Sequence, residues 1–281
     1  MVDHNEVATD VVGDPVPAGL AAHYAARDAR RVDDAVAAVG PAALYAVPRP
    51  GAPETDARRI VEGRNALRGL LTEREPAPHR HEIQLCVHDG DRALVEGVTR
   101  SMATGAAETS FAAAVSLDAD GRIARYVGFG GAPAPDLTPH AAAPTEPTPN
   151  GTARPADMDT VLHEYFAALD RGDFPGAAAR FSPDVLYVHP PYRHTGIDNP
   201  DRVTFRGRAA LLAAFTARGR QSFDHRVTTS IQRGPHGLIE GVVQGLPGGG
   251  TGSFVSSLTL DAAGLIRRYV SFYCEPAVPG A

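Results

Sequence analysis

The chain contains two similar stretches of sequence, one after the other. Residues 24–131 align with residues 166–274 almost without gaps. The best match joins residues 117–127 to residues 260–270, where the pattern Leu-Asp-Ala-x-Gly-x-Ile-x-Arg-Tyr-Val is kept. A period of this length far exceeds the unit of a solenoid repeat, so the sequence predicts a tandem duplication of a whole domain.

Composition excludes several classes of function. The 281 residues are enough for two domains of ordinary size, and the net charge of −6 gives no basic surface for nucleic acid or anionic lipid. All 27 basic residues are arginines, which excludes lysine Schiff-base chemistry. Two cysteines, Cys86 and Cys274, are too few for a disulfide framework. With no apolar leader and no apolar run that could span a bilayer, these features predict a cytoplasmic protein.

Composition also sets the expected domain boundaries. Residues 131–156 are rich in proline, alanine and threonine, a composition typical of a semi-extended linker. We therefore expect a first domain at residues 17–130 and a second at residues 157–276.

Periodicity in the second copy predicts helices followed by strands. Apolar residues recur at helical spacing in residues 160–170 and 207–218, with a short helix at 175–181 between them. Alternating or continuous apolar runs predict strands at residues 185–189, 224–232, 238–245, 253–260 and 266–273. Helices that precede an antiparallel meander indicate an α+β fold.

Four segments of the second copy carry a resemblance to known proteins: residues 165–174 (Tyr-Phe-Ala-Ala-Leu-Asp-Arg-Gly-Asp-Phe), 181–190, 205–211 and 261–273. On these segments the copy resembles the SnoaL-like and ketosteroid-isomerase-like members of the nuclear-transport-factor-2 (NTF2) superfamily. The resemblance implies two tandem NTF2-like cone-shaped domains, each a curved antiparallel sheet wrapped on N-terminal helices around an apolar pocket.

The resemblance also implies positions for a catalytic site. The catalytic tyrosine of ketosteroid-isomerase-like members falls on Tyr165, and their carboxylate base falls on His189. Their second oxyanion donor falls near Ser256. The base position therefore holds an imidazole here, which suits proton transfer near neutral pH.

Strand alternation predicts further members of this site. His225, in register with Val227, Thr229 and Ile231, is expected to face the pocket, as is Glu240. A glutamate beside a histidine can fix the tautomer of the ring. Because His81 and Glu96 are their counterparts in the first copy, a structural histidine–carboxylate contact is an equally open interpretation. The predicted catalytic set is His189, Tyr165, Glu240, His225 and Ser256, and the predicted substrate contacts are Tyr187, Tyr192, His194, Phe254, Phe272 and Tyr273.

The two copies differ at the predicted catalytic positions. The counterparts of His189 and Ser256 are Val47 and Ala113, and that of Tyr165 is His23. We therefore expect the second domain to hold the active site and the first to act as its structural partner in an intramolecular pseudo-dimer.

The leading functional hypothesis is a cofactor-free acid–base enzyme of the isomerase, cyclase or dehydratase type, acting on a small natural-product intermediate. One alternative is a polyether-type epoxide hydrolase or cyclase, in which Asp28 and Asp170 would be the shared acids. The other is a non-catalytic binding or scaffold protein. No metal is predicted, because His189, His194, His225 and Glu240 match no ligand spacing, and no glycine-rich loop precedes a helix to cradle a phosphate.

Overall fold

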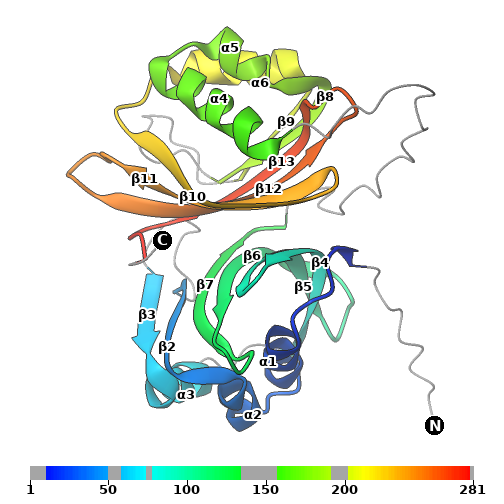
Figure 1. Cartoon of the computed structure of the whole chain (residues 1–281), viewed down its shortest axis with the longest axis vertical. Coiled ribbons are helices and arrows are strands. Elements are labelled where there is room, and N and C mark those ends of the chain that lie inside the picture. Colours follow the sequence, from blue (N-terminus) through cyan, green and yellow to red (C-terminus); the bar gives the residue numbers. More distant parts are fainter. Residues whose placement is uncertain (1–10, 50–57, 74–77, 134–156, 191–201, 279–281) are drawn as a thin grey trace.

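The computed structural model describes residues 11–49, 58–73, 78–133, 157–190 and 202–278. It contains two α+β domains stacked end to end, with their sheets facing each other and their helices at the outer ends (Figure 1). The predicted tandem α+β architecture is confirmed. Most of the predicted linker lies outside the described residues, as do Tyr192 and His194.

The first domain begins with a short strand and two helices, and a third helix follows its second and third strands. Its elements are β1 (Val12–Gly13), α1 (Ala18–Asp28), α2 (Val32–Ala37), β2 (Val39–Pro48), β3 (Arg58–Glu62), α3 (Gly63–Glu73), β4 (His79–Asp89), β5 (Arg92–Ser101), β6 (Ala107–Leu117) and β7 (Ile123–Gly131).

The second domain repeats this order without the initial short strand. Its elements are α4 (Met158–Arg171), α5 (Phe174–Ala178), β8 (Phe181–His189), β9 (Val203–Arg206), α6 (Arg208–Arg218), β10 (Asp224–Arg233), β11 (His236–Gln244), β12 (Thr251–Leu260) and β13 (Ile266–Cys274). Every helix and strand expected in this copy is present, with bounds that differ by a few residues.

The two sheets have the same strand order. The first runs β1-β4-β5-β6-β7-β2-β3 and the second β10-β11-β12-β13-β8-β9. The meander is antiparallel as expected, but β2 pairs with β7, and β8 with β13, in parallel. This parallel closure brings the first long strand of each domain beside its last, so residues far apart in sequence share one sheet.

Local sequence fixes the end of α4, which positions the carboxylate of Asp170. Gly172 caps the helix at φ 79°, a left-handed conformation that glycine adopts without strain. Asp173 then accepts a hydrogen bond from the Gly176 amide at 2.9 Å and starts α5. Asp170 is consequently held in the last turn of α4, pointing toward the first residues of β10.

Each sheet buries both of its faces. One face of the second sheet packs on α4, α5 and α6 and forms the interior of that domain, with Tyr165, Tyr187 and Phe254 among its members. The opposite face packs on the first sheet in a shared apolar cluster that includes Phe129 and Phe272. The central strands β5 and β11 are accordingly buried along nearly their whole length.

Two arginine–glutamate pairs cross between the domains. Arg268 donates to both oxygens of Glu96, at 3.0 and 2.6 Å, and Arg125 donates to both oxygens of Glu240, at 3.2 and 2.7 Å. Arg125 and Arg268 occupy equivalent positions of the two copies, as do Glu96 and Glu240. The duplication therefore produces the same cross-domain contact twice, in opposite directions.

Candidate functional site

A histidine–aspartate pair lies at the edge of the second-domain interior. The Asp170 carboxylate accepts a hydrogen bond from the backbone amide of His225 at 3.1 Å and another from its Nδ1–H at 2.8 Å. Both side chains are largely buried, at 13% and 17% exposure for His225 and Asp170. Because a carboxylate only accepts, Nδ1 carries a proton, and in the neutral ring the lone pair is on Nε2. This is the arrangement in which an acid orients a histidine for proton transfer.

Aromatic side chains surround the imidazole of His225. Its ring stacks on Phe166 at 4.8 Å between centroids, and the edges of Phe223 and Phe254 approach it at 5.6 and 6.0 Å. These contacts fix the ring plane and reduce the access of water. Electrostatic interactions made by the ring are strengthened in such surroundings.

A row of hydroxyl groups lies on the same interior face of the sheet. The hydroxyls of Tyr165 and Tyr187 are 3.3 Å apart, and the ring of Tyr187 stacks on Tyr269 at 4.9 Å. Ser256 Oγ lies 3.0 Å from the Tyr269 hydroxyl and 3.0 Å from Ser271 Oγ. All five side chains are at most 3% exposed. The row provides hydrogen-bond donors in an apolar interior, as a site that binds an oxyanion requires.

His189 ends β8 beside this row. Its ring is parallel to that of Tyr187 at 5.9 Å, and its Nδ1–H donates to the Pro190 carbonyl at 2.8 Å. Burial, followed by the positive charge of Arg218 and a smaller contribution from His225, lowers the pKa of His189 to about 3. The imidazole of His189 is therefore neutral at physiological pH and a weak base.

Two predicted site residues point away from this interior. Glu240 binds Arg125 of the first domain, and Phe272 belongs to the apolar cluster between the sheets. The prediction that Glu240 orients His225 is wrong, because Asp170 fills that role. The prediction that Phe272 contacts substrate in the pocket is also wrong, because its side chain lies between the two sheets and not in the interior of the second domain.

A β-bulge and the two buried faces explain these errors. The pairing of β10 with β11 shifts between Val227 and Thr229, so residues on either side of the shift no longer share a face. Val227 packs in the domain interior, whereas Ile231 packs between the domains. Since both faces of β11 are buried, alternation alone does not tell which face is the interior.

The remaining predicted residues are placed as follows. The interior of the second domain holds Tyr165, Tyr187, His189, His225, Phe254, Ser256 and Tyr273. Tyr273 donates to Glu275 at 2.9 Å, and burial raises its pKa. Any contact of Tyr192 or His194 with substrate stays a prediction.

The first domain repeats the histidine–aspartate pair. Asp28 accepts from the backbone amide of His81 at 2.9 Å and from its Nδ1–H at 2.5 Å. Sequence alignment of the copies relates this pair to Asp170 and His225. The two shared aspartates were noted in the sequence as acids of the epoxide-opening alternative, but their pairing with the histidines was not predicted.

The interior of the first domain is more polar than the sequence comparison indicated. His23 donates from Nδ1 to the Ala35 carbonyl at 2.9 Å, and its Nε2 accepts from the Tyr45 hydroxyl at 3.0 Å. The hydroxyls of Tyr24 and Tyr126 lie 2.9 Å apart. Burial, and then the charge of Arg27, lower the pKa of His23 to about 3. The first domain thus has a hydrogen-bonded interior of its own.

Comparison with known families agrees with this architecture. The profile of the SnoaL-like domain matches residues 20–126 and again residues 162–269. The chain belongs to the SnoaL-like family. The match covers most of both domains, so the family relationship extends to the first domain as well as the second.

Solved structures resemble one domain of this SnoaL-like protein at a time. A candidate ketosteroid isomerase from Kribbella flavida is 24% identical, with 43% of this chain and 81% of that one covered and a TM-score of 0.32. A candidate polyketide cyclase from Sinorhizobium meliloti is 24% identical, with 40% and 94% covered and a TM-score of 0.31.

SalBIII, an epoxide hydrolase/cyclase-like enzyme of pyran ring formation in salinomycin, is 16% identical, with 41% of this chain and 88% of that one covered and a TM-score of 0.32. No curated protein matches the chain. Among the described residues, no helix is long and apolar enough to cross a bilayer.

Proposed function

We propose that the second domain is a cofactor-free acid–base enzyme of the isomerase, cyclase or dehydratase type. Its substrate would be a small organic intermediate of natural-product metabolism that carries a carbonyl group. The observation that carries the proposal is the His225–Asp170 pair, at 2.8 Å, on the interior face that also holds the buried tyrosine hydroxyls. A positioned base and oxyanion donors are the two parts that enolisation needs.

In the proposed reaction, Nε2 of His225 removes a proton from the carbon next to the carbonyl. Asp170 stabilises the resulting imidazolium and keeps Nδ1–H pointed away from the substrate. The negative charge that develops on the carbonyl oxygen is stabilised by hydrogen bonds from the hydroxyl row, with Tyr165 as the first donor.

The fate of the enolate distinguishes the three reaction types. Return of the proton to another carbon isomerises the substrate. Attack of the enolate carbon on a second carbonyl closes a ring, and the new alkoxide takes the proton from the His225 imidazolium. Loss of a β-hydroxyl group, which takes that proton and leaves as water, dehydrates the substrate. Neutral His189, beside Tyr187, would accept a hydrogen bond at Nε2 without changing charge. Each route uses only groups that the chain itself supplies.

Carbon acidity can be tested without knowing the natural substrate. Deuterium incorporation from D₂O, followed by NMR, would be measured on a panel of β,γ-unsaturated ketones and β-keto esters. We expect the wild type to accelerate exchange for at least one class. Asp170→Asn should reduce that rate by up to about 10⁴-fold, because His225 loses the carboxylate that fixes its tautomer and stabilises the imidazolium.

The duplication supplies a matched control for this experiment. Asp28→Asn removes the equivalent carboxylate of the first domain and should leave exchange within about twofold of the wild type. Equal rates for the wild type and Asp170→Asn would contradict the assignment of the base. Tight binding of panel members without exchange would instead support the non-catalytic alternative.

The epoxide-opening alternative has less support from the described residues. It relies on a pair of carboxylates, whereas Asp28 and Asp170 are each paired with a histidine. Hydrolysis of a terminal epoxide panel that survives in His225→Gln but not in Asp170→Asn would favour this alternative over enolisation.

A further inference from the structure

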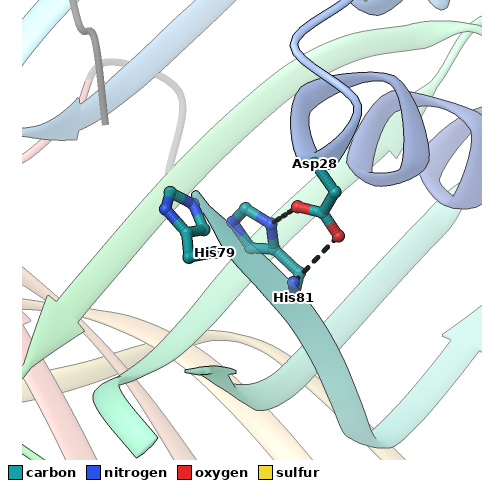
Figure 2. Close-up of side chains that lie close together, drawn as sticks. All are labelled: Asp28, His79 and His81. Atoms are coloured by element: carbon teal, nitrogen blue, oxygen red, sulfur yellow. Dashed lines mark hydrogen bonds and ion pairs between the residues drawn. The ribbon is translucent and has the colours of Figure 1, made fainter. Parts of the chain in front are cut away.

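The first domain carries a cluster of two histidines and an aspartate outside the proposed active site. Asp28 ends α1, and His79 and His81 are the first and third residues of β4. Each offers one ligand atom, and these atoms lie within 4.8 Å of one another (Figure 2). Residues two apart on a strand point to the same face, so the strand itself places both imidazoles side by side.

Asp28 fixes the orientation of one imidazole. Its carboxylate binds both the backbone amide and Nδ1–H of His81, so the lone pair of that ring is on Nε2. Figure 2 shows the carboxylate on one side of the His81 ring and His79 on the other. The edge of one imidazole meets the face of the other, with centroids 5.0 Å apart.

The hydrogen bond between His81 and Asp28 also favours metal ligation. A histidine whose second nitrogen donates to a carboxylate is the usual form of a metal-ligating imidazole.

The second domain provides a comparison that separates this cluster from the histidine–aspartate pair alone. His225 and Asp170 repeat His81 and Asp28, but the position of His79 is taken by Phe223. Phe223 approaches His225 edge to face at 5.6 Å, much as His79 approaches His81. The same position therefore holds a phenyl ring in the second domain and an imidazole, which carries two nitrogen atoms, in the first.

We propose that His79 and His81 bind a divalent transition metal ion in the first domain, with Asp28 holding His81 in the ligating tautomer. Imidazole ligands suit Zn²⁺, Ni²⁺ and Cu²⁺. Two protein nitrogens leave the other coordination positions to water or to oxygen atoms of a small ligand, as in metal sites that keep open positions. This site is separate from the proposed enzymatic site of the second domain and is tested independently.

Metal binding can be measured directly on the full chain after treatment with a chelator and dialysis. Isothermal titration calorimetry with Zn²⁺ or Ni²⁺, and equilibrium dialysis with metal analysis, should give one ion per wild-type chain. His79→Phe copies the arrangement of the second domain and should weaken binding at least tenfold. Asp28→Asn should weaken it by about 10–100-fold, because outer-shell partners of ligating histidines usually contribute that much.

The converse variant tests the geometric argument. Phe223→His builds the same pair of imidazoles beside Asp170 and should raise the stoichiometry toward two ions per chain. His163→Ala, a change on helix α4 away from both clusters, is the control and should bind like the wild type. Circular dichroism and thermal melting would establish that each variant is folded.

Three results would overturn the proposal. The first is no saturable binding of Zn²⁺, Ni²⁺ or Cu²⁺ by the wild type up to millimolar metal. The second is equal affinity of the wild type and a folded His79→Phe. The third is a folded Phe223→His that gains no ion.

Discussion

Arg268→Met should destabilise the protein strongly, because it removes the partner of a fully buried carboxylate. Arg268 donates to Glu96 Oε2 at 3.0 Å and Oε1 at 2.6 Å, and to Ser257 Oγ at 2.7 Å. The side chains of Arg268 and Glu96 are 3% and 0% exposed, so water does not replace the lost donors. Breaking a buried ion pair from one side costs about 3–5 kcal/mol.

Substitutions of two other arginines should lower the free energy of unfolding by smaller amounts and so provide a comparison. Arg125 makes the equivalent contact with Glu240, but its side chain is 17% exposed, so we expect a smaller loss of about 1.5–3 kcal/mol for Arg125→Met, the range of a charged hydrogen bond. Arg267 is adjacent to Arg268 and pairs with Asp184 at 3.4 Å with both side chains about half exposed or more. Arg267→Met should cost about 0–1 kcal/mol, as surface pairs do.

The assay is urea unfolding at neutral pH, monitored by circular dichroism, for the three single variants and for Glu96→Met/Arg268→Met. The double variant removes both charges and should recover most of the stability, since replacing a buried pair by apolar groups is often neutral or stabilising. If Arg268→Met loses no more than Arg267→Met, the cross-domain pair is not desolvated as described. A double variant no more stable than Arg268→Met would also refute the reasoning.

Further predictions concern pH and packing. The pKa of His23 is about 3 in the folded protein against an ordinary value near 6.5, so the unfolded chain takes up a proton first as the pH falls. Stability should therefore fall as the pH drops from 6.5 to about 3, and His23→Gln should reduce this slope by up to about 1.4 kcal/mol per pH unit. Parallel stability–pH curves of the two proteins in urea unfolding would contradict this. Gly241→Ala would place a Cβ 2.4 Å from Cζ of Phe254 and should cost about 1–3 kcal/mol of unfolding free energy. Gly69→Ala, a helix position with open space, should instead be neutral or stabilise by up to about 1 kcal/mol.

Comparing the two copies predicted the fold well because the repeated residues serve the backbone. In the last hairpin of each domain, Asp118 and Asp261 each accept two backbone amide hydrogen bonds, which fixes the turn. The repeated Glu-Gly sequence of the central strand also has a structural reason. The glutamate binds an arginine of the other domain, and the glycine leaves room for Phe111 or Phe254.

The same comparison misplaced part of the site. Glu240 was expected beside His225 because strand alternation on two neighbouring strands placed both side chains in the pocket. The second sheet is buried on both faces, by its own helices on one side and by the first domain on the other. A sequence pattern of apolar residues does not reveal on which of these two faces a given side chain lies. The β-bulge between Val227 and Thr229 compounds this, since it moves the residues beyond it to the other face.

Residues kept in both copies therefore have two different structural roles, and the structure shows which residue has which role. Glu96 and Glu240 are kept for the contact between the domains, whereas Asp28 and Asp170 are kept to orient a histidine inside each domain. What distinguishes the two interiors is the group beside the oriented imidazole. It is His79 in the first domain and Phe223 in the second. The imidazole of His79 adds a second nitrogen ligand in the first domain, whereas the phenyl ring of Phe223 offers none in the second. We therefore propose that the same duplicated fold binds a metal in the first domain and carries out metal-free proton transfer in the second.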